Sequence, residues 1–279
     1  MAPERTIMEN NAVYELNNVS YSYAGRFTAL SNVDLKIDKG EKIALVGANG
    51  SGKSTLLLVL AGLFFPEAGT IKFLGEDLKE ESFNLSSFQK NFRSRVGILF
   101  QNSDVQLFNS SVDDELIFGL TQLGLTEAET GRRMEEYVDL MDIGHLMQRH
   151  PQQLSIGEKK RVAIASVFAM EPEIILLDEP TSGLDPRTSR HLIDAIFKFG
   201  QKGCTIITAT QDIHIVPEIS DRVVVMGEDK RKVRDGAAEE VLKDFAFLEA
   251  HNLIHNHVHR HKDIAHVHPH GHPSHEHTH

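Results

Sequence analysis

The stretch GANGSGKST at residues 47–55 constrains the fold of this chain more than any other. It fits the phosphate-binding pattern G-x-x-x-x-G-K-[ST], and it lies between a predicted buried strand at residues 42–46 and a predicted apolar helix at residues 56–65. Glycines let the backbone curl so that successive N–H groups point at one phosphate, and the following helix adds the positive end of its dipole. An ordinary glycine-rich turn is the alternative, and it leaves the complete pattern in this context unexplained. The sequence therefore predicts a nucleotide-phosphate site, here called the phosphate loop.

The side chains of the phosphate loop have separate chemical uses. We expect Lys53 to reach the β- and γ-phosphates of ATP and the Ser54 hydroxyl to bind Mg²⁺. The other loop residues expected at the nucleotide are Gly47, Asn49, Gly50, Ser51, Gly52 and Thr55.

A second site feature is a pair of carboxylates, Asp178 and Glu179, which directly follows the apolar run at residues 174–177. Asp178 is expected to hold Mg²⁺ directly or through water, while Glu179 points elsewhere and polarises an attacking water. A solvated acidic pair after a strand is the alternative, and the phosphate loop makes it the weaker one.

The order of apolar patterns predicts an α/β fold. Alternating residues predict an antiparallel hairpin at residues 13–21 and 33–37. Further on, predicted strands alternate with predicted helices, which indicates a largely parallel sheet covered on both faces. The predicted strands are residues 70–73, 96–100, 174–177, 204–209, 222–226 and 230–234; the predicted helices are residues 53–61, 158–170 and 187–199, with a helical insertion at about 102–170 and loop plus a short helix at 75–95.

Composition narrows the class of protein. The net charge of −11 gives a weak argument against nucleic acid as a partner. The longest apolar run, residues 56–65, is far shorter than the roughly twenty residues of a membrane span, and residues 1–10 resemble neither a signal peptide nor an anchor. The single cysteine, Cys204, lies in a predicted buried strand and fits a reducing cytoplasm.

A break in composition near His251 begins a histidine-rich tail, residues 251–279, which is expected to be disordered because it cannot form a packed core. Neutral imidazoles suit Ni²⁺, Co²⁺ and Zn²⁺, so the tail is a candidate for loose metal binding, with a solvated end as the alternative. The candidate ligands are His255, His257, His259, His261, His266, His268, His270 and His272.

The run LSIGE at residues 154–158, some twenty residues before Asp178, resembles the signature motif of ATP-binding-cassette (ABC) transporter ATPases. The resemblance covers about residues 11–245. It implies a P-loop NTPase with a RecA-like core, an antiparallel β subdomain and an α-helical signature subdomain. It also implies a dimer that encloses two ATP molecules, in which Ser155, Gly157 and Glu158 complete the site of the partner. Ser155 is expected to cap a helix that begins near Glu158.

Other family positions match single residues of this chain. Tyr23 resembles the aromatic that stacks on adenine, although it could equally be a core tyrosine. Gln101 matches the glutamine that senses Mg²⁺, so that Ser54, Gln101 and Asp178 form the expected Mg²⁺ set. Asp185 resembles the residue that communicates across the dimer.

Two positions depart from the family pattern. Gln211 stands where the family usually has a histidine at the γ-phosphate; because an amide cannot take up a proton, we expect slower hydrolysis with ATP binding retained. His214 lies one turn further on and is expected at the surface. Ile156 replaces a common glycine, and its β-branch narrows the allowed backbone.

The segment from Gln101 to Phe108, which contains Gln106 and Leu107, resembles the ATPases of energy-coupling-factor importers, especially those for cobalt or nickel. This resemblance implies a peripheral subunit at the cytoplasmic face of the membrane, partnered by a transmembrane coupling subunit and a substrate-binding membrane subunit, with the counterpart of Gln106 bracing the coupling helices. The alternatives are a generic ABC linker, a vitamin importer, and a soluble ABC ATPase or nucleotide-sensing module of low turnover.

Overall fold

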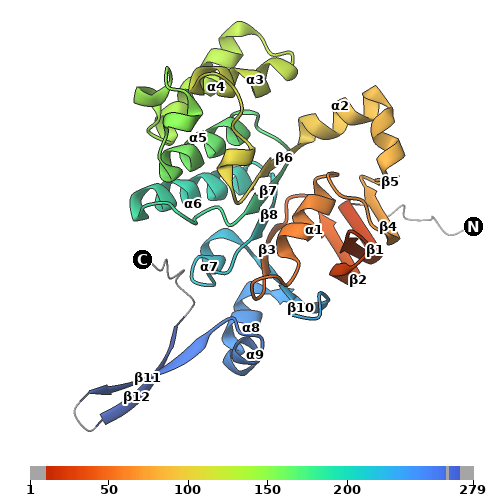
Figure 1. Cartoon of the computed structure of the whole chain (residues 1–279), viewed down its shortest axis with the longest axis vertical. Helices are drawn as coiled ribbons and strands as arrows, with labels where there is room; N and C mark the ends of the chain where they lie inside the picture. Colours follow the sequence, from red (N-terminus) through yellow and green to blue (C-terminus); the bar gives the residue numbers. More distant parts are fainter. Residues whose placement is uncertain (1–10, 262–263, 271–279) are drawn as a thin grey trace, which may run out of the picture.

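The computed structural model describes residues 11–261 and 264–270, and its centre is a six-stranded sheet (Figure 1). The strand order is β10-β9-β3-β8-β7-β6, and only the β10–β9 pair is antiparallel. The apolar strands β3, β7 and β8 are buried along nearly their whole length, as strands covered on both faces are. The predicted parallel sheet is confirmed. Its strands are β3 (Lys42–Val46), β6 (Val96–Leu99), β7 (Ile174–Asp178), β8 (Thr205–Ala209), β9 (Arg222–Met226) and β10 (Lys232–Ala237).

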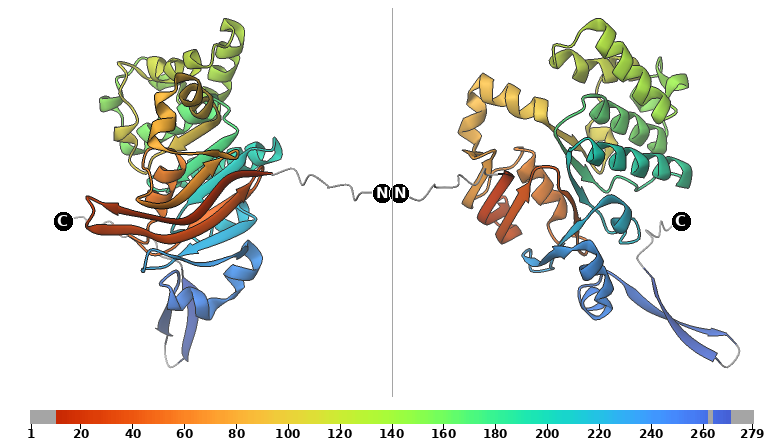
Figure 2. Two further views of the ribbon diagram at one scale, coloured as in Figure 1. Left: turned by 90° about the vertical axis from the view of Figure 1, so that its right-hand side faces the viewer. Right: turned by 180° about the vertical axis from the view of Figure 1, so that it is seen from behind.

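A second sheet is antiparallel, with the order β2-β1-β4-β5. Its two long strands form the predicted hairpin, which curves across one side of the molecule (Figure 2). The strands are β1 (Ala12–Tyr23), β2 (Phe27–Asp38), β4 (Ala68–Phe73) and β5 (Glu76–Asp77). Helix α1 (Lys53–Leu60) shares one apolar core with both sheets, and the buried hydroxyl of Tyr14 on β1 donates to the Leu60 carbonyl over 2.9 Å. The hairpin is therefore fixed beside the phosphate loop.

A group of helices lies on the other side of the central sheet (Figure 1). Helices α3 (Val112–Gln122), α4 (Glu127–Leu140) and α5 (Ile156–Ala169) pack around one core with α6 (Pro186–Gln201). The remaining helices are α2 (Ser86–Arg95), α7 (Val216–Ile219), α8 (Ala238–Lys243) and α9 (Phe245–Ala250), with 3-10 turns η1 (Glu80–Asn84), η2 (Ser103–Val105), η3 (Gly144–Leu146) and η4 (Pro151–Gln153). Within the described part of the chain, no helix has the length and apolarity that a membrane crossing requires.

Two predicted helix boundaries were wrong. Helix α5 begins at Ile156 rather than near Glu158, because the predicted cap Ser155 directly precedes the first helical residue. Helix α1 ends at Leu60, within one residue of the predicted helix at residues 53–61, but the rest of the apolar run to residue 65 is not helical. The physical reason is Gly62, which has a left-handed φ of +62° and stops the helix. The predicted burial of Cys204 is confirmed, and burial raises the pKa of its thiol to about 12.

The histidine-rich tail contains a hairpin, which corrects the expectation of disorder for part of it. Strands β11 (His255–His261) and β12 (Ile264–His270) pair with each other in a sheet of their own (Figure 2). The expectation considered only whether a core could form, whereas a two-stranded ribbon needs only backbone pairing and alternating residues. The register places His255 opposite His270 and His257 opposite His268. His272 lies outside the described residues.

Candidate functional site

The phosphate loop connects β3 to α1 and depends on glycine at two tightly packed positions. Gly52 caps α1 with φ +104°, and a Cβ atom there would lie 2.3 Å from the Ala29 carbonyl oxygen. A Cβ atom on Gly47 would lie 2.4 Å from the Met226 carbonyl oxygen. Both contacts are with backbone oxygens. A larger residue at either position would therefore require the backbone to move, because no side-chain movement could relieve the contact. The loop is thus a backbone cradle at the start of α1, as the sequence predicts.

Lys53 and Ser54 lie at the first turn of α1, on the side of the carboxylates. The buried Lys53 ammonium donates to the carbonyls of Gly47 over 2.8 Å and Ala48 over 3.1 Å. Burial lowers the pKa of Lys53, and the nearby charges of Glu179 and Asp178 act in the opposite direction. The Ser54 hydroxyl donates to Asp178 Oδ1 over 3.0 Å. Two of the three predicted Mg²⁺ ligands are therefore in contact, in an oxygen-rich set that suits this hard cation.

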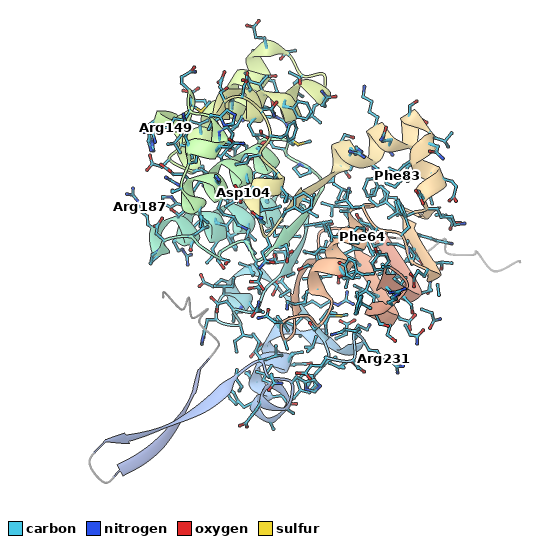
Figure 3. All side chains as sticks on the ribbon, in the orientation of Figure 1. Phe64, Phe83, Asp104, Arg149, Arg187 and Arg231 are labelled. Carbon is cyan, nitrogen blue, oxygen red and sulfur yellow. The ribbon has the colours of Figure 1, made fainter. Side chains whose placement is uncertain are left out.

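An aromatic group lies at the outer end of the phosphate loop. Tyr23 is 40% exposed, its hydroxyl is 3.0 Å from Thr55 Oγ1, and its ring packs edge-to-face on Phe64, which Figure 3 labels. Phe27 is 70% exposed at the start of β2 and lines the same cavity. Sequence reasoning missed Phe27, although its position directly across the hairpin from Tyr23 was a usable signal. Exposed aromatic faces next to a phosphate cradle can stack on a base.

Glu179 is buried at the end of β7 in a strained backbone conformation. Its φ is +43°, a left-handed value that is rare for a glutamate, and its N–H donates to the Ala209 carbonyl over 2.9 Å. Burial raises the pKa of the carboxyl group, while Lys53 and hydrogen bonds from Gln211 lower it. Among the described residues, its Oε1 atom is buried without a hydrogen-bond partner. This is an acceptor that can take the proton of a bound water.

Gln211 follows β8 and lies next to the Glu179 carboxylate. Both its backbone N–H and its side-chain amide donate to Glu179, and the Thr210 hydroxyl lies 3.4 Å from Glu179 Oε2. The sequence suggested a contact with phosphate or water, and the structure adds this contact with the glutamate. His214 is exposed, as predicted.

One cavity of about 320 Å³ brings most predicted ATP-binding residues together. It contains the phosphate loop, the aromatic group and both catalytic candidates. The lining residues are Tyr23, Phe27, Thr28, Ala29, Asn49, Gly50, Gly52, Lys53, Ser54, Thr55, Gln101, Glu179 and Gln211. Thr28 and Ala29 were missed by sequence reasoning. Gly47, Ser51 and Asp178 do not line it, although Gly47 and Asp178 accept hydrogen bonds from two residues that do.

The signature residues do not line the ATP cavity. Ser155 caps α5 in a capping box: its Oγ accepts from Glu158 N over 3.3 Å, and Glu158 Oε2 accepts from Ser155 N over 2.7 Å. These bonds lower the pKa of Glu158. Ile156 is 76% exposed at the first helical position, so its β-branch does not distort the signature backbone. The signature is therefore a capped helix N-terminus that lies outside the cavity of its own phosphate loop.

Asp185 has a local structural role at the start of α6. Its Oδ1 atom accepts from the N–H groups of Arg187 and Thr188, each over 3.0 Å, and its Oδ2 accepts from the Thr188 hydroxyl over 2.6 Å. These hydrogen bonds lower the pKa of Asp185. A Cβ atom on Gly157 would lie 3.5 Å from the Gly183 carbonyl oxygen, so the loop before Asp185 adjoins the signature.

A second cavity, of about 370 Å³, lies between the signature helix and the segment after β6. Gln101 lines both cavities, and Lys160 lines the second. Lys160 is only 2% exposed, and burial lowers the pKa of its ammonium to about 8 despite the nearby Asp178 and Glu179. Asp104 lies in this region between the helices and the sheet (Figure 3) and accepts from Lys159 over 2.6 Å. No sequence pattern singles out Lys160.

Exposed apolar side chains follow Gln101. Val105 and Phe108 are 68% and 66% exposed, and the Phe108 ring packs edge-to-face on the exposed Phe118 at 5.2 Å. The buried Glu115 carboxylate accepts from Phe108 N over 3.0 Å and holds this loop. Gln106 itself turns back onto β6, where its Oε1 accepts from Phe100 N over 3.2 Å.

Known proteins resemble this chain over most of its length. The family model described as "ABC transporter" matches residues 30–182. A Methanosarcina acetivorans protein, provisionally named as an ABC transporter ATP-binding protein, is 47% identical over 89% of this chain and 91% of its own length. The nickel import ATP-binding protein NikO of Rhodobacter capsulatus is 43% identical over 86% of this chain and 95% of its own. An energy-coupling factor transporter ATP-binding protein EcfA, from Methanococcus maripaludis, is 37% identical over 87% of this chain and 85% of its own.

Two solved structures have the same fold. CbiO1 of Clostridium perfringens, part of the ABC transporter complex CbiONQ, matches with a TM-score of 0.70 and 35% identity over 87% of this chain and 95% of that one. A dimeric ATP-binding cassette in a post-hydrolysis state, bound to ADP and Pi, matches with a TM-score of 0.71 and 27% identity over 81% of this chain and 98% of that one.

Proposed function

This chain belongs to the ABC transporter ATPases, and we propose that it is the ATP-hydrolysing subunit of an energy-coupling-factor importer for cobalt or nickel ions. As a member of that family it binds and hydrolyses ATP. Two copies enclose two ATP molecules and lie at the cytoplasmic face of the membrane, where their closing and opening drives the membrane subunits.

The residues of the ATP cavity fit this chemistry. At Gly47 and Gly52 the phosphate loop has no space for a side chain, so its backbone can approach the phosphates closely. Ser54, Gln101 and Asp178 offer the oxygen ligands that Mg²⁺ prefers. Bound there, Mg²⁺ neutralises charge that develops on the phosphates. Glu179 accepts a proton from the attacking water through its unpaired Oε1, and Lys53 binds the phosphates. Tyr23 and Phe27 hold the base.

One observation supports the proposed dimer most directly: the signature residues lie outside the cavity that holds their own phosphate loop. A capped helix N-terminus with exposed Ser155 is an anion site without a phosphate of its own. In the proposed dimer Ser155, Gly157 and Glu158 complete the site of the partner. Asp185 caps α6 and so holds the loop that precedes it next to the signature residues.

The exposed Val105, Phe108 and Phe118 are the surface proposed for the transmembrane coupling subunit. Val105 and Phe108 follow Gln101 in the same segment, and Phe118 packs on Phe108, so a membrane subunit that binds here would contact the segment that begins at the ATP cavity. Exposed apolar patches of this kind mark protein interfaces. A substrate-binding membrane subunit would complete the transporter.

Cobalt or nickel is proposed as the cargo on two grounds. NikO is named as a nickel import protein, and CbiO1 is part of the CbiONQ complex. The tail hairpin also sets histidines opposite one another, His257 with His268 and His259 with His266. Imidazole ligands suit nickel and cobalt.

If the tail binds transition metals, a chain without the tail should bind much less metal. A chain ending at Ala250 should lose at least about nine-tenths of the Ni²⁺ and Co²⁺ bound by the full chain, because the candidate histidines are absent. Equilibrium dialysis measures the metal bound per chain. A variant with the even-numbered tail residues Asn256, Val258 and Arg260 changed to alanine is the control, and it should keep full binding. Equal metal binding by the shortened chain would contradict the proposal.

Uptake tests the transporter itself. The chain is purified with the membrane proteins that accompany it, reconstituted in vesicles, and assayed with labelled Co²⁺, Ni²⁺ and vitamins in the presence of ATP. The proposal expects ATP-dependent uptake of one metal that disappears with Glu179→Gln. Uptake of a vitamin alone would show that the chain belongs to a vitamin importer instead. ATP hydrolysis without any membrane partner would indicate a soluble ATPase.

The glutamine at position 211 predicts a gain of activity. Gln211→His should raise ATP turnover by a factor of less than about one hundred, because a histidine can also exchange a proton while Gln211 already donates to Glu179. Phosphate release by the assembled transporter measures the change. Gln211→Leu, which removes the amide donor, should lower turnover instead. A histidine variant no faster than the unchanged chain would contradict this role.

A further inference from the structure

Two side chains from different segments form hydrogen bonds with the peptide groups of Phe100 and Gln101. Phe100 N donates to Gln106 Oε1 over 3.2 Å. Lys160 Nζ, which comes from α5, donates to the Phe100 carbonyl over 3.3 Å and to the Gln101 carbonyl over 3.2 Å. The backbone that carries a predicted Mg²⁺ ligand is therefore held by one glutamine and one lysine.

Lys160 is unusual because its charge is buried without a carboxylate at hydrogen-bond distance. Within the described residues its ammonium forms hydrogen bonds with two backbone carbonyls and no ion pair. Burying an ammonium is unfavourable unless its hydrogen bonds are made, so these bonds restrict how Gln101 can move relative to α5. A hydrophobic residue would fill the same space without this restriction.

The neighbouring Lys159 makes a useful contrast. It lies one position earlier on α5 and forms an ion pair with Asp104; the Lys159 side chain is 18% exposed and the Asp104 side chain 61%. Because water reaches the carboxylate, this pair holds its partners weakly. Of these two adjacent lysines, only Lys160 reaches the backbone next to the ATP cavity.

Lys160 also lies five positions after Ser155 on the same helix, a rise of about 7.5 Å along a rigid element. We propose that Lys160 is a positioning residue that ties Gln101 to the first turns of α5, so that the Mg²⁺ ligand of one ATP site and the signature surface offered to the partner's site move together. The proposal deepens the dimer mechanism above and rests on it. Lys160 does not touch the nucleotide; it acts through Gln101 and α5.

The test compares three variants in the assembled transporter. Lys160→Met keeps the apolar stem and removes the donors, Lys160→Arg keeps charge and donors, and Lys159→Met is the matched control. Lys160→Met should raise the Mg²⁺ concentration for half-maximal ATP turnover by about tenfold and lower maximal turnover by a similar factor, the loss expected for a buried charged hydrogen bond. Lys160→Arg should recover most of both, and Lys159→Met should stay within about twofold.

ATP binding without Mg²⁺ separates positioning from damage to the fold. The proposal expects Lys160→Met to bind as many ATP molecules per chain as the unchanged protein does. It is overturned if turnover falls while the Mg²⁺ dependence stays the same, if ATP binding falls in parallel, or if the methionine variant behaves like Lys159→Met. If the protein without substitutions does not hydrolyse ATP, the proposed function itself is contradicted. Failure of the positioning proposal and failure of the proposed function therefore give different results.

Discussion

Glu179→Gln should lower ATP turnover by about two to four orders of magnitude while ATP binding persists, the range found when a general base is lost. Glutamine has nearly the same shape and keeps the packing at the end of β7. It cannot accept a proton, and burial has already raised the pKa of the natural carboxyl group towards that of a useful base. The unpaired Oε1 atom is where the proton would go.

The matched control for this variant is Glu173→Gln. Glu173 is an exposed glutamate just before the opposite end of β7, so its change has the same chemistry away from the ATP cavity. Phosphate release and ATP binding are measured side by side on the assembled transporter. The control should retain full turnover. Turnover above about a third of normal in Glu179→Gln would contradict the assignment of Glu179 as the base.

Lys53→Met should weaken ATP binding by about thirtyfold or more. Removing one partner of a buried charge pair costs roughly 2–5 kcal/mol, which corresponds to such a factor. Lys53 is 6% exposed, and its ammonium lies on the carbonyls of Gly47 and Ala48, at the bottom of the phosphate cradle. Methionine preserves the stem of the side chain but offers no charge to a phosphate.

Lys230→Met is the control for the phosphate loop. Lys230 also touches the loop, because its ammonium donates to the Gly50 carbonyl over 2.7 Å, but this hydrogen bond lies at an exposed place. Its replacement should change the dissociation constant of ATP by less than about threefold. Calorimetric titration with ATP measures both variants, and melting temperatures verify that both are folded. Equal weakening by the two changes would show that Lys53 has no special role.

Local sequence patterns predicted the parts of the site that lie on consecutive residues. The phosphate loop, the Asp178–Glu179 pair and the Ser155 cap each combine fixed spacing with a strand or helix boundary, and the structure has them in those settings. The two sheets were also predictable because apolar alternation distinguishes the hairpin from the buried parallel strands.

Contacts between distant segments could not be predicted in the same way. Lys160 appears in the sequence as one charge in a basic run, and only the packing of α5 against β6 brings it to the Gln101 backbone. Phe108 and Phe118 meet because Glu115 folds the intervening loop.

Mixing two inactive chains tests the central claim most directly, namely that two copies share each ATP site. Lys53→Met disables the phosphate loop, and Ser155→Arg blocks the signature with a bulky side chain. Each variant alone should be inactive in the assembled transporter. Among random pairs about half are mixed, and each mixed pair has one intact site, so the mixture should recover about a quarter of normal turnover. No recovery, although differently tagged chains are captured together, would contradict shared sites.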